Sequence, residues 1–125
     1  MMKDMAYGDD DCSLWPCDII LADCNIDLAK PLRGKYKTKL GAYRALKKFA
    51  GGGLVEAAIK LAMINALKRV EFPWTGDLVG IVAGDQGPTL ALFWQGKWLG
   101  RTQQGYRVMP ANFGVMAWEV PKCRR

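Results

Sequence analysis

Hydrophobic residues recur at helical spacing in the first half of the chain. The pattern predicts three helices, over residues 13–24, 38–49 and 54–68. Pro16 limits where the first helix begins, because proline is tolerated only within the first helical turn. Ser13 or a later residue therefore opens this helix, and Cys12 lies at its entrance. Thr38 is the expected side-chain cap of the second helix, and the glycines at 51–53 end it.

The same spacing selects the side chains that should face the core. In the second helix, the apolar residues three positions apart are Leu40, Tyr43, Leu46 and Phe49. In the third helix, the inward residues are Leu54, Ala58, Leu61 and Leu67. Lys68 and Arg69 would then lie at the carboxyl end of the third helix, where the helix dipole favours positive charge.

Short apolar runs separated by glycine and proline turns fill the second half of the chain. They predict strands at residues 78–82, 89–94, 97–102, 106–109 and 115–120. Helices followed by short strands define the α+β fold class, with the N-terminal helices packed on an antiparallel β-meander. A chain of 125 residues has the length of one domain, so a single domain over 1–125 is expected, with loose tails at 1–8 and 121–125.

Charge is distributed unevenly along the chain. The formal net charge is +6, but residues 1–27 carry seven aspartates against Lys3 alone, and residues 28–50 carry eight bases and no acid. The two segments could neutralise each other on neighbouring surfaces, or the basic segment could dock an acidic protein partner. Nucleic-acid binding is disfavoured, because no helix-turn-helix and no aromatic–basic alternation accompanies the bases. The candidate partner-binding residues are Lys30, Arg33, Lys35, Lys37 and Lys39.

Four cysteines stand at positions 12, 17, 24 and 123. In a reducing cytoplasm they are expected as reduced thiols, with Cys17 and Cys24 on one helical face as core residues. The spacings of five and seven residues differ from the closely spaced ligand pairs of zinc and iron–sulfur sites. Neither a metal nor another cofactor is therefore expected.

The composition is that of a globular domain, with 50% hydrophobic and 24% charged residues. No apolar run approaches the roughly 18 residues of a membrane span, and the acidic opening lacks the apolar core of a signal peptide. The protein is expected to stay in the compartment where it is made, or to be assembled into a larger structure there.

Two motifs carry a family resemblance. Asp11-Cys12-Ser13 opens the first helix, and Thr75-Gly76-Asp77-Leu78-Val79 leads into the β-meander. This arrangement resembles the NlpC-type cell-wall cysteine peptidases, which have a papain-like α+β fold. It resembles more closely a set of small phage and prophage proteins related to that fold, through Leu14-Trp15-Pro16, Asp27, Arg33-Gly34-Lys35-Tyr36, Gly52-Gly53 and Ala117-Trp118-Glu119-Val120. The resemblance spans about residues 7–120 and implies an NlpC-like single domain.

The resemblance implies that Cys12 holds the position of the catalytic nucleophile, where a helix N-terminus stabilises a thiolate. In the peptidases the base is a histidine on the strand after the Gly-Asp turn, and Thr89 or a close neighbour stands there in this chain. Gln103 or Arg101 would hold the third position, on the next strand. The chain contains no histidine, and a missing acid–base group costs on the order of 100- to 10,000-fold in rate. A catalytically inactive pseudoenzyme is therefore expected.

The resemblance and the missing histidine together favour a structural protein of a bacteriophage tail tip or baseplate. Such a protein would be made in the host cytoplasm and become part of the virion. It would contact other tail proteins of the hub or tail tip through the basic segment and through exposed residues among Trp94, Trp98 and Trp118. The alternative is a weak or partner-completed cysteine hydrolase that acts on peptidoglycan peptides with Cys12 as nucleophile. A third hypothesis is a nucleic-acid-associated phage protein that uses its basic loop.

Overall fold

Three helices open the fold, in the predicted order. The computed structural model describes residues 15–84, 87–102 and 105–121. Within these ranges the helices are α1 (Trp15–Cys24), α2 (Lys39–Ala50) and α3 (Leu54–Ile64), and a short 3-10 turn, η1 (Lys30–Leu32), lies between the first two. Pro16 is in the first turn of α1, where a proline removes no helical hydrogen bond.

The ends of α2 are formed by the residues that the sequence singles out. The Thr38 side chain accepts a hydrogen bond from the backbone N–H of Gly41 at 2.9 Å, which caps the first turn. At the other end, Gly51 has a φ of 77°, in the left-handed region, and its N–H donates to the carbonyl of Lys47 at 2.8 Å. Both predicted boundaries of this helix are confirmed to within one residue.

The third helix is shorter than predicted, because it ends at Ile64. Ala66 has a φ of 54°, and the N–H of Leu67 donates back to the carbonyl of Ala62 at 2.9 Å. This bond and the left-handed residue form a Schellman C-terminus, which a glycine usually marks. The two bases that follow are therefore not at the end of the helix as predicted, and Arg69 instead begins a strand.

Among the described residues, six strands form one antiparallel sheet in the order β1-β6-β2-β3-β4-β5. Their bounds are β1 (Arg69–Val70), β2 (Leu78–Gly84), β3 (Gly87–Trp94), β4 (Lys97–Thr102), β5 (Gly105–Pro110) and β6 (Gly114–Glu119). A 3-10 turn, η2 (Ala111–Phe113), joins the last two strands. The five predicted strands are confirmed. β1 was missed, because two residues are too few to show alternation.

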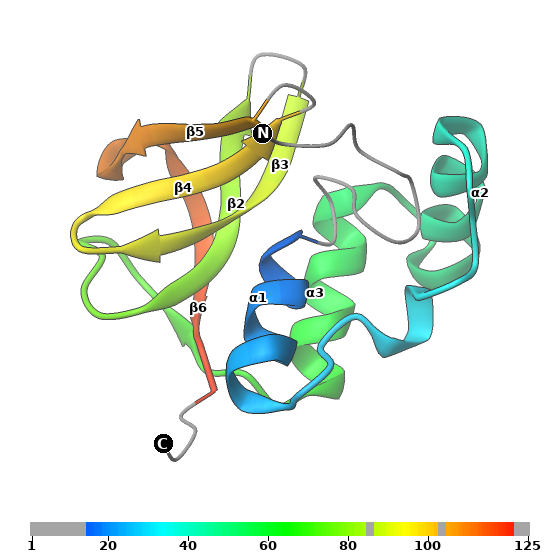
Figure 1. Ribbon diagram of the computed structural model, residues 1–125, viewed down its shortest axis with the longest axis horizontal. Helices are drawn as coiled ribbons and strands as arrows, with labels where there is room; N and C mark the ends of the chain where they lie inside the picture. The colour runs from blue at the N-terminus through cyan, green and yellow to red at the C-terminus, as the bar shows by residue number, and fades with distance from the viewer. Residues whose placement is uncertain (1–14, 85–86, 103–104, 122–125) are drawn as a thin grey trace.

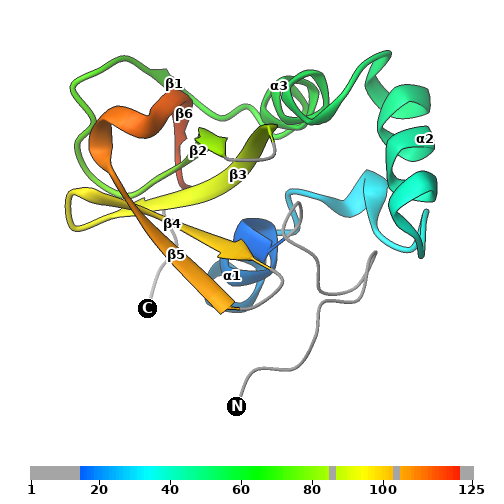
Figure 2. The ribbon, with the colours of Figure 1, turned by 90° about the horizontal axis from the view of Figure 1, so that it is seen from above.

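Each face of the sheet carries its own core. Alternate residues of β2 and β3, such as Val79, Ile81 and Leu90, pack against the helices in a first core. The residues between them, such as Val82 and Ala91, pack in a second core on the other face. Figure 1 shows the helices gathered on one side of the sheet, and Figure 2 shows how strongly the sheet curves.

Trp98 of β4 lies at the centre of the second core. Its side chain is fully buried, its ring centroid lies 4.9 Å from that of Phe93, and its Nε1 donates to the carbonyl of Ala111 at 3.0 Å. Trp118 is also buried, on the helix-covered face. Of the three tryptophans considered for a docking surface, only Trp94 is exposed.

α2 is the outermost helix (Figures 1 and 2), and it packs on η1 and α3. Leu40 and Tyr43 were predicted to face the core, but they are 57% and 59% exposed. A spacing of three residues falls short of the helical turn of 3.6 residues by about 60° at each step, so Leu40 and Phe49 lie on opposite sides of α2. The inward side is formed instead by Ala42, Ala45, Leu46, Phe49 and Ala50.

Candidate functional site

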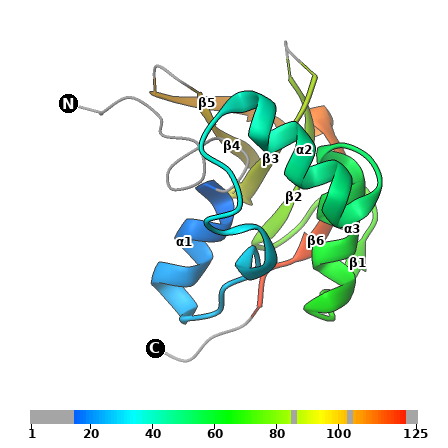
Figure 3. The same cartoon turned by 90° about the vertical axis from the view of Figure 1, so that its right-hand side faces the viewer.

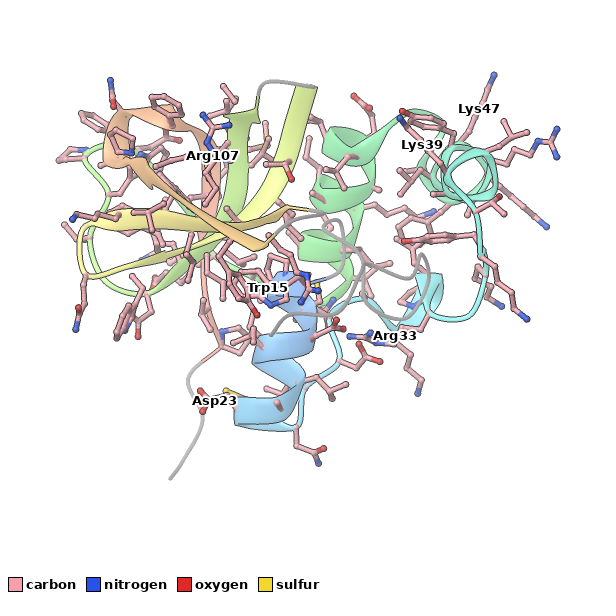
Figure 4. All side chains as sticks on the ribbon, turned by 45° about the horizontal axis from the view of Figure 1, so that its top comes forward. Trp15, Asp23, Arg33, Lys39, Lys47 and Arg107 are labelled. Carbon is pink, nitrogen blue, oxygen red and sulfur yellow. The ribbon has the colours of Figure 1, made fainter. Side chains whose placement is uncertain are left out.

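The start of α1 lies against the β4–β5 hairpin. Trp15 is buried, and its ring centroid is 5.3 Å from that of Tyr106 on β5. Tyr106 pairs across the hairpin with Arg101 of β4, whose guanidinium carbon lies 5.7 Å from the Tyr106 ring centroid. Figure 4 shows Trp15 at this end of α1. Cys12 precedes Trp15 by three residues and, like Gln103, lies outside the described residues.

Arg101 is a buried cation on the face of the sheet that α1 covers, with 9% of its surface exposed. Its contact with the Tyr106 ring is a cation–π interaction, which is strengthened where water is excluded. Sequence reasoning placed Arg101 here only as the alternative to Gln103. An arginine in a strand gives no signal of burial by itself.

Thr89 lies on the opposite face of β3 from α1. It pairs with Val82, whose side chain belongs to the second core, and directly opposed residues in antiparallel strands point to the same face. Its neighbour Leu90 points to the other face and packs in the same core as Cys17 and Ile20 of α1. The resemblance places the catalytic base at Thr89 or a close neighbour on β3. The neighbour that packs with α1 residues is Leu90, which is apolar.

The two described cysteines differ from the expectation of reduced thiols. Cys17 is a buried thiol of the first core. Cys24, however, is disulfide-bonded, so the expectation was wrong for this residue, and its partner lies outside the described residues. The Cys24 Sγ is 3.7 Å from the carbonyl oxygen of Pro121, near the end of the described chain.

The described residues form no group of three His, Cys, Asp or Glu side chains that could hold a metal ion. Within the same residues, no helix has the length and apolar character that crossing a bilayer requires.

Arg33 is engaged within the chain rather than displayed on its surface. Its Nη1 lies 2.6 Å from Asp18 Oδ1 on α1, and its Nε lies 2.7 Å from Asp27 Oδ1 (Figure 4 labels Arg33). Burial by itself lowers the pKa of Arg33, and the hydrogen bonds to Asp27 and Asp18 more than reverse this, so the pKa is raised. The acidic and basic segments thus neutralise each other at this point.

The other bases of the segment remain on the surface. Lys30, Lys35, Lys37 and Lys39 are exposed, and none of them forms an ion pair within the described part of the chain. The outward side of α2 adds an outer strip at helical spacing, formed by Leu40, Tyr43, Arg44 and Lys47. Figure 4 shows Lys47 directed away from the body of the molecule.

A groove runs between η1, α2 and α3, and its volume is about 410 Å³. Its apolar lining comes from Pro31, Leu32, Ala45 and Phe49. Its three charged residues are Lys35, Lys48 and Lys60, and we call it the lysine groove. In Figure 3, which views the molecule from its α2 side, η1 and α3 lie next to α2. Sequence reasoning missed Lys60, because it lies on α3, outside the basic segment.

Comparison with known proteins gives one match. A family model described as "Domain of unknown function (DUF6950)" matches residues 1–120. No curated protein matches the chain, and no solved structure matches it.

Proposed function

We propose that this chain, which belongs to the DUF6950 family, is a catalytically silent docking protein of a phage tail tip or baseplate. In this proposal an NlpC-like domain contacts neighbouring tail proteins through its basic surface. The assignment to phage and to the NlpC-like fold is carried by the sequence motifs, from Asp11-Cys12-Ser13 to Ala117-Trp118-Glu119-Val120. An N-terminal helix packed on the strands that follow Gly76-Asp77 is consistent with it.

The observation that supports docking best is the outer strip of α2. Leu40 and Tyr43 are more than half exposed, and they stand beside Arg44 and Lys47 on a helix whose inward side is already packed. Arg44 and Lys47 form no ion pair among the described residues. Exposed apolar side chains that adjoin one another are costly to keep in water and are typical of a surface that binds another protein. The surrounding bases select an acidic partner surface.

The proposal of catalytic silence rests on two facts. The chain contains no histidine, so the usual base and acid of a cysteine hydrolase are absent from it. The β3 side chains that pack in the first core, under the helices, are Leu90 and Leu92, and neither can accept or donate a proton. A thiol at Cys12 would therefore have no group on this strand to activate it or to protonate a leaving amine.

Incorporation into virions tests the docking function. In a phage that carries this gene, charge reversal at Lys35, Lys37 and Lys39 to Glu should sharply reduce the amount of the chain in purified particles. Higher salt should reduce it further, because screening weakens the remaining attraction. The matched control reverses three exposed bases elsewhere, Lys68, Arg69 and Lys97, and should assemble normally. Normal incorporation of the first variant would refute the proposal.

One observation favours the partner-completed hydrolase as a second candidate. The buried Arg101 lies beside the Tyr106 ring, and that ring also contacts Trp15, three residues after Cys12 in the sequence. Under this hypothesis Arg101 would be the cation that stabilises the Cys12 thiolate. Under this hypothesis another tail protein supplies the base. Purified wild-type tails would then release soluble muropeptides from peptidoglycan, and tails that carry Cys12→Ala would not. Equal release from both would exclude this candidate.

A further inference from the structure

The lysine groove combines an apolar lining with three cations on its rim. Its volume of about 410 Å³ lies within the range of ligand pockets, roughly 300–1,000 Å³. Pro31 and Leu32 come from η1, and Ala45 and Phe49 come from α2. Of the charged groups, Lys35 lies in the turn after η1, Lys48 on α2 and Lys60 on α3. An occupant must therefore offer apolar surface to the lining and negative charge to the rim.

Lys60 is held in place at the groove. Its Nζ donates to the carbonyl of Phe49 at 2.5 Å and lies 4.5 Å from the centroid of the Phe49 ring. That carbonyl belongs to the last turn of α2, where the helix dipole is negative, so this lysine is partly satisfied within the fold. Lys35 and Lys48, in contrast, form no ion pair within the described residues, which leaves two cations for a ligand.

The chemistry of the lining distinguishes between anionic partners. Phe49 is the only aromatic residue among those that line the groove, and Lys60 lies over one face of its ring, so the groove offers no series of rings on which successive nucleobases could stack. The other apolar side chains, from Pro31, Leu32 and Ala45, offer no donor or acceptor that could read a base edge. An aliphatic or aromatic side chain of a peptide matches this lining, and flanking carboxylates match Lys35 and Lys48.

We propose that the lysine groove binds an acidic peptide segment of a partner protein, which inserts an apolar side chain against Ala45 and Phe49 and places carboxylates beside Lys35 and Lys48. The inference rests on the proposed docking function and specifies the partner as an acidic peptide segment with an apolar side chain. It adds to the outer strip a second docking surface, on the side of α2 that faces η1 and α3.

Fluorescence anisotropy with the full chain and a labelled peptide tests the groove. The probe has two glutamates on each side of a leucine–phenylalanine pair and is titrated at physiological salt. Saturable binding is expected, and replacing the leucine and phenylalanine of the probe by serine should weaken it more than about tenfold, because the apolar contact is lost. Equal binding of the two probes would mean that only charge attraction is at work, and it would overturn the proposal.

Adjacent residues of α2 provide matched variants. Lys48→Glu, in the groove, should weaken binding about tenfold, whereas Lys47→Glu, on the outer strip, should change it less than about threefold. Ala45→Trp fills the lining without changing the charge and should also abolish saturable binding. Circular dichroism establishes that each variant folds. Equal affinities of the Lys47 and Lys48 variants, or unchanged binding by folded Ala45→Trp, would refute the groove as the site.

Related experiments distinguish an acidic partner peptide from three other possible occupants of the lysine groove. A dimer that Lys48→Glu dissociates would assign the groove to a second copy, and a single-stranded oligonucleotide that displaces the probe would assign it to nucleic acid. A carbodiimide cross-link within one chain from Lys48 to Asp9 or Asp10 would assign it to the acidic N-terminal segment. In virions, normal incorporation of Lys48→Glu and Ala45→Trp with failure of the Lys35, Lys37 and Lys39 variant would refute the groove and keep the docking function.

Discussion

Arg33 joins the acidic and basic segments of the chain through one hydrogen bond to each of two aspartates. It bonds Asp18, fifteen residues earlier, and Asp27, six residues earlier, so it fastens η1 and the preceding loop to α1. The side chains of this cluster are 22–27% exposed, which places the cluster between a surface ion pair and a buried one. Removing the arginine leaves two carboxylates close together, without the cation that compensates them.

We predict that Arg33→Ala lowers the free energy of unfolding by about 1–2 kcal/mol. Lys37→Ala, at an exposed base of the same segment, should change it by less than about 0.5 kcal/mol. Because the pKa of Arg33 is raised, its stabilisation is fully present below the ordinary arginine pKa and is lost only as pH rises through the still higher folded value. Urea unfolding at pH 8 and pH 10 should therefore give the same difference between the wild type and Arg33→Ala. A cost that disappears at pH 10 would contradict this account.

At Gly80 the backbone of β2 lies so close to Trp98 and to β6 that there is no room for a side chain. A Cβ at this position would lie 2.8 Å from Trp98 Cη2 and would also meet the backbone carbonyl of Met116. We predict that Gly80→Ala costs more than about 2 kcal/mol, because the backbone of β6 must move. Gly100→Ala meets only the flexible end of Met109 at 3.1 Å and should cost less than about 1 kcal/mol. Similar costs for the two variants, measured by urea unfolding, would be inconsistent with this packing.

At the level of elements, the sequence predicted what depends on local spacing and failed where distant parts of the chain decide. The N-terminus of α2 was predictable, because Thr38 caps it locally. The side of α2 that is buried was not predictable, because apolar residues spaced three apart lie all around the helix, and only its packing on η1 and α3 selects the inward side.

In the candidate site too, local features were predictable and contacts between distant elements were not. The helix that carries Pro16 in its first described turn was predictable, whereas the burial of Arg101 and the closeness of Lys60 to Phe49 arise only when separate elements pack.

The C-terminus of α3 offers a direct test of this distinction. Ala66 occupies the left-handed region that glycine adopts at lower cost, so its strain is not visible in the sequence. We predict that Ala66→Gly raises the free energy of unfolding by about 0.5–1 kcal/mol, because relief of the strain exceeds the entropy cost of glycine. Ala42→Gly, inside α2, should lower it by about 1 kcal/mol. Thermal and urea unfolding should show shifts of opposite sign, and a destabilised Ala66→Gly would contradict the assignment.

At the scale of the whole molecule, a covalent link fastens the end of α1. Cys24 is disulfide-bonded, and its Sγ lies 3.7 Å from the carbonyl oxygen of Pro121, two residues before Cys123 in the sequence. We therefore predict that Cys123 is the partner of Cys24. Non-reducing peptide mapping should recover this pair, and reduction should lower the free energy of unfolding by about 2–4 kcal/mol, because the disulfide closes a loop of nearly the whole chain. A linked peptide that contains Cys12 in place of Cys123 would refute the pairing.

The whole chain also sets the expectation for catalysis. A cysteine hydrolase needs a nucleophile, a base that takes its proton and an acid that protonates the leaving amine, and the second and third functions usually fall to one histidine. The chain has no histidine, and Leu90 and Leu92 are the β3 side chains on the face that the helices cover. We predict that the purified protein releases no more soluble muropeptides from peptidoglycan than its Cys12→Ala variant does, across pH 5 to 9. A muramidase serves as the positive control for the substrate. Release that exceeds the Cys12→Ala background would show that the chain activates its thiol without imidazole, and catalytic silence would have to be abandoned.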